Sequence, residues 1–211
     1  MFTEQLQRVR VKICGITRAE DAVHAAKLGA DAIGLVFYRG SPRCIDAARA
    51  KVILAALPPF VSRVGLFVDQ DAAEIRSVLE QLPLDYLQFH GSESPGECGV
   101  YNKPYIKSVT MNNGVDLTSQ ARRYAGASCL LLDTHVEGMA GGTGQSFDWS
   151  RIPRSLEKPI LLAGGLTPEN VRSAVTAVRP YGVDVSSGVE QSKGVKDPEK
   201  LATFIRAACT A

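Results

Sequence analysis

The sequence has little charge imbalance, few histidines and no closely paired cysteines. Its 24 basic and 22 acidic residues leave a formal net charge of +2, too small to favour nucleic acid or a membrane surface as partner. The five cysteines are odd in number, widely spaced and without a CxxC pair, which disfavours both a disulfide framework and a structural zinc site. These features predict a protein of a reducing cytoplasm.

Long apolar runs are also missing. No segment approaches the ~20 consecutive apolar residues of a membrane span, and residues 1–12 have no apolar core of signal-peptide length. We therefore expect a soluble, cytoplasmic protein. The chain of 211 residues, 45% of them hydrophobic, is long enough to bury its own core as one domain spanning 1–211.

Short β-branched runs alternate with amphipathic segments along the whole chain, a pattern typical of βαβ units around a parallel sheet. We expect strands at 9–14, 31–37, 62–68, 85–90, 104–110, 128–133, 159–164 and 181–187. The helical segments that follow them are 19–29, 46–57, 72–82, 94–101, 114–125, 147–153, 167–178 and 197–209. The fourth and sixth of these are the weakest.

Eight such pairs predict an α/β fold of the (β/α)8 barrel type with parallel strands. A length of 211 residues is compact for this architecture, which typically takes ~250 residues. The alternative is a doubly wound open sheet. No GxGxxG motif follows the first strand, and the even spacing of eight units favours a closed barrel.

In such a barrel the active site lies at the carboxyl ends of the strands. The seventh and eighth ends carry Gly164-Gly165 and Ser187-Gly188, where backbone N-H groups can approach an anion without hindrance from a Cβ. Loops seven and eight are where barrels build phosphate sites, and residues after Ser187 could open a short helix toward the same anion. Glycines that only serve tight turns are the alternative.

Asp133 ends the buried run SCLLLD, so its carboxyl group should face the barrel mouth with a raised pKa suited to general-acid catalysis. It could instead cap a helix or form a loop salt bridge. The following segment carries four glycines between Gly138 and Gly144, among them Gly142, which is typical of a loop that wraps a ligand. A merely disordered loop is the alternative.

Cys14 ends the first expected strand, in the segment VKICGIT. A single cysteine is more often a buried filler than a catalyst, but a thiol among the strand ends, facing Asp133 and near a basic phosphate site, could ionise and take a proton. Lys12 lies on the same side of that strand, one layer deeper. It needs a carboxylate partner inside a barrel, for which we expect Asp184 on the eighth strand, in a mainly structural pair.

Two further residues at strand ends carry polar groups. Arg43 follows the second strand and offers a forked pair of donors suited to a substrate carboxylate, unless it is simply a solvated loop arginine. His90 ends the fourth strand and could donate a hydrogen bond at the mouth or cap the turn with Gly91. The other two histidines, His24 and His135, do not cluster with it, so we expect neither metal nor cofactor.

Several motifs in this order resemble the phosphoribosylanthranilate isomerase family of the tryptophan pathway, over essentially the whole chain from Val11 onward. The motifs are KICGIT, SPR, QFHG, LLLDT with GGTGQSFDW, LAGGL and DVSSGVE. Any one of them is weak, but KICG at the first strand together with LLLDT at the sixth is specific. The chain does not depart from the family pattern at these positions.

The resemblance implies an Amadori rearrangement of an aminoaldose to an aminoketose without a cofactor. By the family's pattern Asp133 is the general acid that opens the sugar ring, and Cys14, as thiolate, removes the proton from C2. Arg43 would hold the anthranilate carboxylate. The phosphate would rest on the N-H groups of Gly164, Gly165, Ser187 and Gly188, with the glycine loop around Gly142 closing over it and His90 lining the site.

Two alternatives to this function stay open. One is another sugar-phosphate barrel enzyme, either a pentose-phosphate epimerase, which needs metal ligands at its strand ends, or the histidine-pathway isomerase, which has an aspartate where Cys14 stands. The other is a non-catalytic barrel that binds a phosphorylated ligand. The sequence does not determine the oligomeric state, and we expect a monomer or a homodimer.

Overall fold

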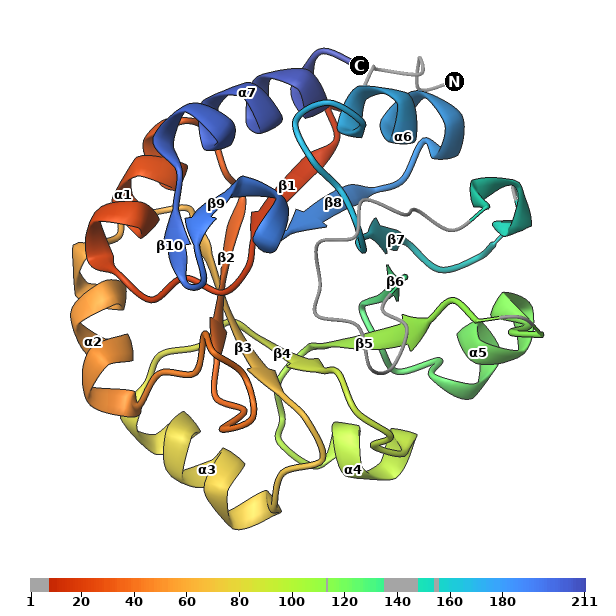
Figure 1. The fold of residues 1–211 in the computed structure, drawn as a ribbon. Coiled ribbons are helices and arrows are strands. Elements are labelled where there is room, and N and C mark those ends of the chain that lie inside the picture. Colours follow the sequence, from red (N-terminus) through yellow and green to blue (C-terminus); the bar gives the residue numbers. More distant parts are fainter. Residues whose placement is uncertain (1–7, 113, 135–147, 154–155) are drawn as a thin grey trace, which may run out of the picture.

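Eight parallel strands close into a barrel with helices around it (Figure 1). This computed structural model describes residues 8–112, 114–134, 148–153 and 156–211. The strands are β1 (Arg10–Ile13), β2 (Ala32–Val36), β3 (Ser62–Phe67), β4 (Tyr86–Phe89), β5 (Tyr105–Thr110), β6 (Cys129–Asp133), β7 (Ile160–Leu162) and β8 (Gly182–Val185). Each pairs with its neighbours in chain order, and β8 pairs with β1, with Lys12 opposite Asp184. The predicted (β/α)8 barrel is confirmed.

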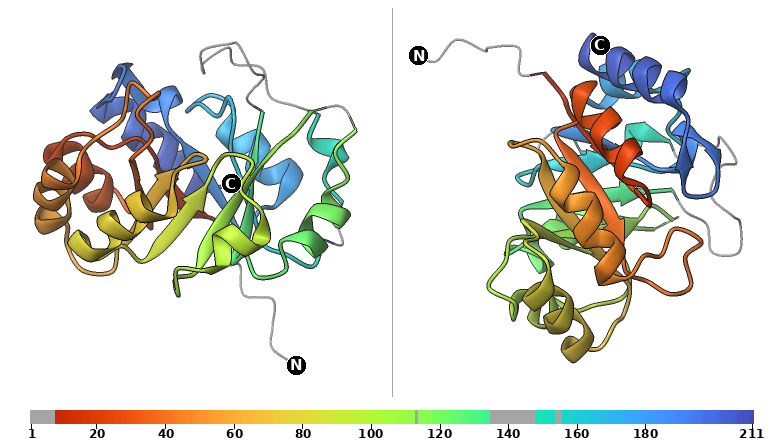
Figure 2. Two further views of the ribbon diagram at one scale, coloured as in Figure 1. Left: turned by 90° about the horizontal axis from the view of Figure 1, so that it is seen from below. Right: turned by 90° about the vertical axis from the view of Figure 1, so that its left-hand side faces the viewer.

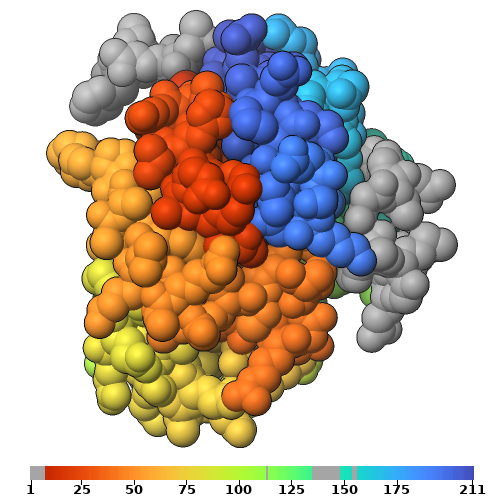
Figure 3. All heavy atoms as spheres, turned by 60° about the vertical axis from the view of Figure 1, so that its left-hand side comes forward, coloured from red at the N-terminus to blue at the C-terminus, as the bar shows by residue number. Residues whose placement is uncertain are grey.

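Helices follow most of the strands and cover the outside of the barrel. They are α1 (Ala19–Lys27), α2 (Ala47–Ala56), α3 (Ala72–Gln81), α4 (Pro95–Gly99), α5 (Leu117–Arg123), α6 (Val171–Val178) and α7 (Pro198–Cys209). The first and last helices lie side by side where the ring closes, as the red and blue surfaces of Figure 3 show. None of the helices in the described part of the chain is long and apolar enough to cross a membrane.

The fourth and sixth helical segments are as short as the sequence predicts. Helix α4 is five residues long and begins with a capping box, in which Ser94 and Glu97 each bond the other's backbone N-H group. Between β6 and β7 the described residues form a single 3-10 turn, η1 (Trp149–Arg151). The ring of helices is correspondingly thin beside β7 (Figures 1 and 2).

The buried side chains divide into a large outer core and a smaller inner one. Because strand residues alternate in direction, Ile13, Leu35, Phe67 and Leu132 face the helices and are almost fully buried. Two separate small clusters line the barrel interior; they comprise Val64, Ile106, Cys129, Leu131, Leu161 and Ala163, and, nearer the mouth, Cys14, Val36 and Leu66. Cys14 therefore lies inside the barrel in the layer nearest the mouth, as its position at the end of β1 predicts.

A small hairpin after β8 is absent from the sequence prediction. Residues after β8 form a 3-10 turn, η2 (Ser187–Val189), at the place where the sequence suggested that a short helix could open. The chain then forms two short antiparallel strands, β9 (Glu190–Ser192) and β10 (Val195–Lys196), before α7. In Figure 1 this hairpin lies beside β1 and α1, close to the barrel opening.

Candidate active site

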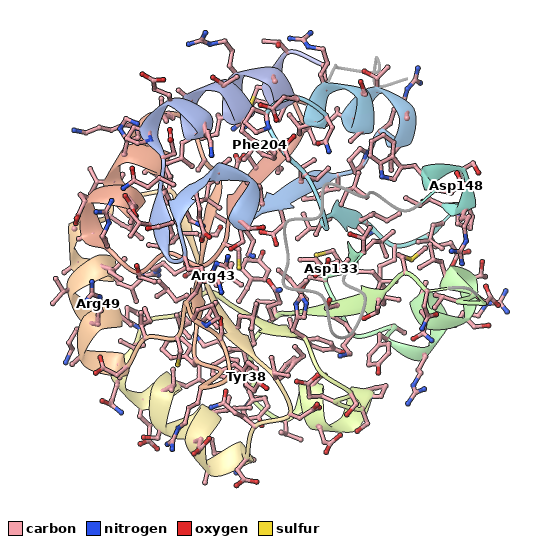
Figure 4. The ribbon with its side chains drawn as sticks, in the orientation of Figure 1. Tyr38, Arg43, Arg49, Asp133, Asp148 and Phe204 are labelled. Atoms are coloured by element: carbon pink, nitrogen blue, oxygen red, sulfur yellow. The ribbon has the colours of Figure 1, made fainter. Side chains whose placement is uncertain are left out.

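The residues predicted from the strand ends gather around one opening of the barrel. Figure 4 shows Arg43 and Asp133 directed toward the middle of the barrel from opposite sides, whereas Arg49 and Asp148 lie at the periphery. Asp133 is the last residue of β6, Cys14 directly follows β1 and His90 directly follows β4. Their location follows from the rule that parallel barrels place reactive groups at the carboxyl ends of strands.

Cys14 is held in a tightly packed site. Its side chain is buried, and its backbone N-H group donates to the Val185 carbonyl oxygen at 2.8 Å, which extends the β1–β8 pairing by one residue. A Cβ on Gly34 of β2 would lie 2.8 Å from Cys14 Sγ, so the glycine makes room for the thiol. Gly15 has a φ of +71°, and a Cβ there would overlap Cδ of Arg43. Gly15 therefore leaves room for the Arg43 side chain to pass over the carboxyl end of β1.

The Lys12–Asp184 pair lies directly beneath the thiol. Lys12 Nζ donates to Asp184 Oδ1 at 2.8 Å, and both side chains are buried, which confirms the predicted pairing. Burial disfavours the ammonium form of Lys12, but Asp184 and Cys14 together more than offset this effect and raise the pKa of the lysine. A Cβ on Gly34 would also lie 3.1 Å from Lys12 Nζ, so the ammonium group and the thiol border the same small space.

The surroundings of Cys14 favour the neutral thiol over the thiolate. Burial raises the pKa of Cys14 above its ordinary value, and the positive charges of Lys12 and Lys196, which act in the opposite direction, do not fully offset it. The sequence suggested a thiol that ionises near a basic site. The structure differs because the same packing that places Cys14 at the mouth also removes it from water.

Asp133 and His90 contact each other across the mouth. His90 Nε2 lies 3.1 Å from Asp133 Oδ2, and His90 Nδ1 lies 3.0 Å from the amide nitrogen of Gln88. Since an amide nitrogen can only donate, this arrangement places the proton of a neutral His90 on Nε2, directed at the carboxyl group. Of the two roles considered for His90, the structure favours donation at the mouth.

Loops seven and eight form a shared pocket. Gly165, Thr167, Ser187, Gly188 and Lys200 line it together with Leu166, Pro168 and Glu169. Gly164 and Gly165 both have positive φ values, of +75° and +65°, a conformation that favours glycine. A Cβ on Gly188 would overlap the Leu166 carbonyl oxygen, so the two loops touch only because this residue is glycine. Backbone N-H groups and the Lys200 ammonium group suit an anion here.

Arg43 is not a solvated loop arginine, because its side chain is only 19% exposed and is paired with Glu190. Its Nε and Nη2 atoms both donate to the Glu190 carboxylate, each at 2.7 Å, and Lys196 Nζ lies 2.9 Å from the same carboxylate. The two cations hold the pKa of Glu190 below its ordinary value although burial acts against this. Lys196, which faces Arg43 as well as Glu190, has a lowered pKa because of its burial.

Sequence reasoning missed Glu190, Lys196 and Lys200. The signal that could have found Glu190 is the motif DVSSGVE, which ends on it, but nothing in the sequence indicates that the chain turns back toward Arg43 there. Gly142 and the rest of the predicted glycine loop lie outside the described residues, so their role stays a prediction. No group of three His, Cys, Asp or Glu side chains that could hold a metal occurs in the parts of the chain that are described.

The chain is similar to proteins of one known family. Residues 11–207 match the family described as N-(5'phosphoribosyl)anthranilate (PRA) isomerase. An N-(5'-phosphoribosyl)anthranilate isomerase of Nitrosococcus oceani is 58% identical over 199 residues, which cover 94% of this chain and 97% of the relative.

Two crystal structures extend the comparison to the fold. The phosphoribosyl anthranilate isomerase of Thermotoga maritima is 43% identical with a TM-score of 0.89, and the match covers 96% of this chain and 100% of that one. A phosphoribosyl anthranilate isomerase in complex with reduced 1-(o-carboxyphenylamino)-1-deoxyribulose 5-phosphate is 42% identical with a TM-score of 0.85 and the same coverage. The chain described here belongs to the N-(5'-phosphoribosyl)anthranilate isomerase family.

Proposed function

We propose that this protein catalyses the Amadori rearrangement of N-(5'-phosphoribosyl)anthranilate to 1-(2-carboxyphenylamino)-1-deoxyribulose 5-phosphate, a step of tryptophan biosynthesis. The observation that carries the proposal is the family match over residues 11–207, which includes every described residue of the site. The reaction is an internal redox isomerisation, since C1 of the sugar is reduced and C2 oxidised. It therefore balances without an external oxidant or reductant.

Asp133 acts as the general acid in this proposal. Its carboxyl proton goes to the furanose ring oxygen, the bond between that oxygen and C1 breaks, and the nitrogen lone pair forms the C=N bond of a Schiff base. The contact with His90 supports this role, because an N-H group directed at Oδ2 fixes the carboxyl orientation and stabilises the carboxylate left after proton transfer.

Cys14 acts as the general base, as thiolate. It takes the proton from C2, and the C-H electron pair forms the C1=C2 bond of an enolamine while the C=N electrons return to nitrogen. The enolamine then becomes the ketone by losing its hydroxyl proton and gaining one at C1. One proton has moved from Asp133 to Cys14, and exchange with solvent restores both groups. Lys12 supports the thiolate, because its positive charge opposes the effect of burial on the Cys14 pKa.

The remaining residues bind the two anionic ends of the substrate. Arg43 holds the anthranilate carboxylate, and the backbone N-H groups of Gly164, Gly165, Ser187 and Gly188 hold the phosphate. The pocket that Gly165, Ser187 and Gly188 line between loops seven and eight supports the phosphate site. Anchoring both ends of the substrate places C1 and C2 between Asp133 and Cys14. The reaction is faster because the reacting groups are already oriented.

We also propose a cytoplasmic location and a monomer or homodimer as the working form. All five cysteines, which lie in the described part of the chain, are free thiols, and this supports a reducing compartment. The proposed partner is the small-molecule substrate alone.

The test mixes purified protein with freshly made phosphoribosylanthranilate and follows the loss of anthranilate-type fluorescence. We expect Cys14→Ala and Asp133→Asn to fold normally and to lose ~10²-fold or more in kcat, the usual scale for acid-base groups. Cys209→Ala is the matched control, since Cys209 is half-buried at the end of α7, where it contacts Arg8 ahead of β1. Wild-type turnover no faster than the spontaneous reaction would favour the non-catalytic phosphate-binding barrel.

A further inference from the structure

Glu190 contacts the Arg43 guanidinium through both of its carboxylate oxygens. Its carboxylate accepts from Nε and Nη2 of the guanidinium, both at 2.7 Å, while its own side chain is only 5% exposed. A bidentate contact of this kind fixes the plane and rotation of the guanidinium as well as its position. Arg43 comes from the loop after β2 and Glu190 from β9, so the contact joins segments 147 residues apart.

Two lysines, Lys196 and Lys200, hold Glu190 in place. Lys196 Nζ bonds Glu190 Oε1 at 2.9 Å and the Ser186 carbonyl oxygen at 3.0 Å, and its side chain is fully buried. Lys200 Nζ bonds the backbone oxygen of Glu190 at 3.0 Å. The Glu190 carboxylate, which contacts Arg43, is therefore held in place directly after loop eight, the loop that carries Ser187 and Gly188.

One edge of the Arg43 guanidinium stays available. Glu190 occupies the edge formed by Nε and Nη2, and within the described residues no group accepts a hydrogen bond from Nη1. The edge formed by Nη1 and Nη2 has the spacing of a carboxylate. The charges of Arg43, Lys196 and Glu190 sum to one positive charge, which suits a single incoming carboxylate.

We propose that Glu190 is a positioning residue that turns the Nη1/Nη2 edge of Arg43 toward the substrate and so makes the site selective for a ligand with a carboxylate ortho to its amine. The inference rests on the proposed function, because it takes the anthranilate carboxylate as the group that Arg43 binds. In Glu190→Gln the amide would direct N-H groups at Arg43 or Lys196, and the guanidinium would lose its fixed orientation.

The experiment compares two non-reacting ligands by equilibrium titration. The first is reduced 1-(o-carboxyphenylamino)-1-deoxyribulose 5-phosphate, and the second is the same compound made from aniline, which lacks the carboxylate. We expect Glu190→Gln to weaken binding of the first ligand by about tenfold or more, the scale of a charge-assisted hydrogen bond, and to leave the second unchanged. With phosphoribosylanthranilate, KM should rise by a similar factor and kcat should change little.

The matched control is Asp21→Asn. Asp21 Oδ2 accepts from the backbone N-H of Lys196 at 3.1 Å, so it supports the same hairpin without touching Arg43. If loosening the hairpin alone caused the effect, this variant would reproduce it. If Glu190→Gln fails to fold, Glu190→Asp replaces it, because the shorter side chain keeps the charge but cannot reach both donor atoms while bonded to Lys196.

A double variant separates positioning from general damage. In an Arg43→Gln background, Glu190→Gln should cause no further loss of selectivity, since its effect passes through Arg43. Unchanged selectivity in Glu190→Gln, or an equal loss for both ligands, overturns the proposal. A wild type that discriminates between the ligands but does not turn over phosphoribosylanthranilate overturns the isomerase function and leaves the role of Glu190 standing. If the wild type binds both ligands equally well, the ligand carboxylate has no role in binding, and the proposed role of Glu190 is overturned as well.

Discussion

A single methyl group added at Gly34 should lower kcat strongly while the protein stays folded. Gly34 lies in the middle of β2, and its φ is not in the left-handed region, so alanine causes no backbone strain there. The added Cβ would lie 2.8 Å from Cys14 Sγ, 3.1 Å from Cys14 Cα and 3.1 Å from Lys12 Nζ. Non-bonded heavy atoms prefer about 3.5–4.0 Å, so the thiol must move by about 0.7–1.2 Å.

This displacement should lower both the stability of the protein and its kcat. Overpacking a buried site by one methyl group costs about 1–3 kcal/mol, and for a domain of this size each kcal/mol lowers Tm by about 2–4 °C. The protein should therefore stay folded, with a Tm about 2–12 °C below that of wild type. A misplacement of about 1 Å at a reacting group costs about 10²-fold in rate, so kcat should fall by that factor.

The assay measures kcat by loss of substrate fluorescence at a temperature where thermal melting shows Gly34→Ala to be folded. Gly99→Ala is the matched control, because a Cβ at that position meets nothing within 4 Å and its φ is not positive. It should keep full activity. Gly34→Ala with wild-type kcat, or with a loss no larger than the unfolded fraction, would refute the reasoning that the thiol must hold its place.

Three further predictions follow from the same site. Arg43→Ala should raise KM with little change in kcat, measured in steady state, because the carboxylate is held alike in the ground and transition states; an unchanged KM contradicts the clamp. Gly188→Ala should weaken inhibition by inorganic phosphate about tenfold or more, since its Cβ forces loop eight away from the Leu166 carbonyl oxygen. In the ligand-free protein, alkylation of Cys14 by iodoacetamide, followed by peptide mass spectrometry, should reach its midpoint at a higher pH than alkylation of a cysteine in an unfolded peptide, because burial raises the pKa of the thiol. A midpoint below that of the peptide would mean that Lys12 and Lys196 outweigh burial.

The sequence determined the barrel and most of its mouth. Apolar runs alternating with amphipathic segments specify strands and helices locally, and eight units in a row leave few topologies other than a closed barrel. Because every parallel strand ends at the same face, Cys14, His90 and Asp133 could be assigned to the mouth from their places in the sequence alone. Strand alternation likewise predicted that Lys12 meets Asp184.

Only the tertiary structure decided what these groups do to one another. The pairing of Arg43 with Glu190 depends on a hairpin that folds back over the barrel, and no local pattern encodes a contact between residues 147 positions apart. The direction of the Cys14 pKa depends on burial and on the distances to Lys12 and Lys196, which are properties of packing in three dimensions. Residue type and order therefore determined which strand-end groups reach the site, and packing decided which hairpin residues join them and how all of these groups are oriented and charged.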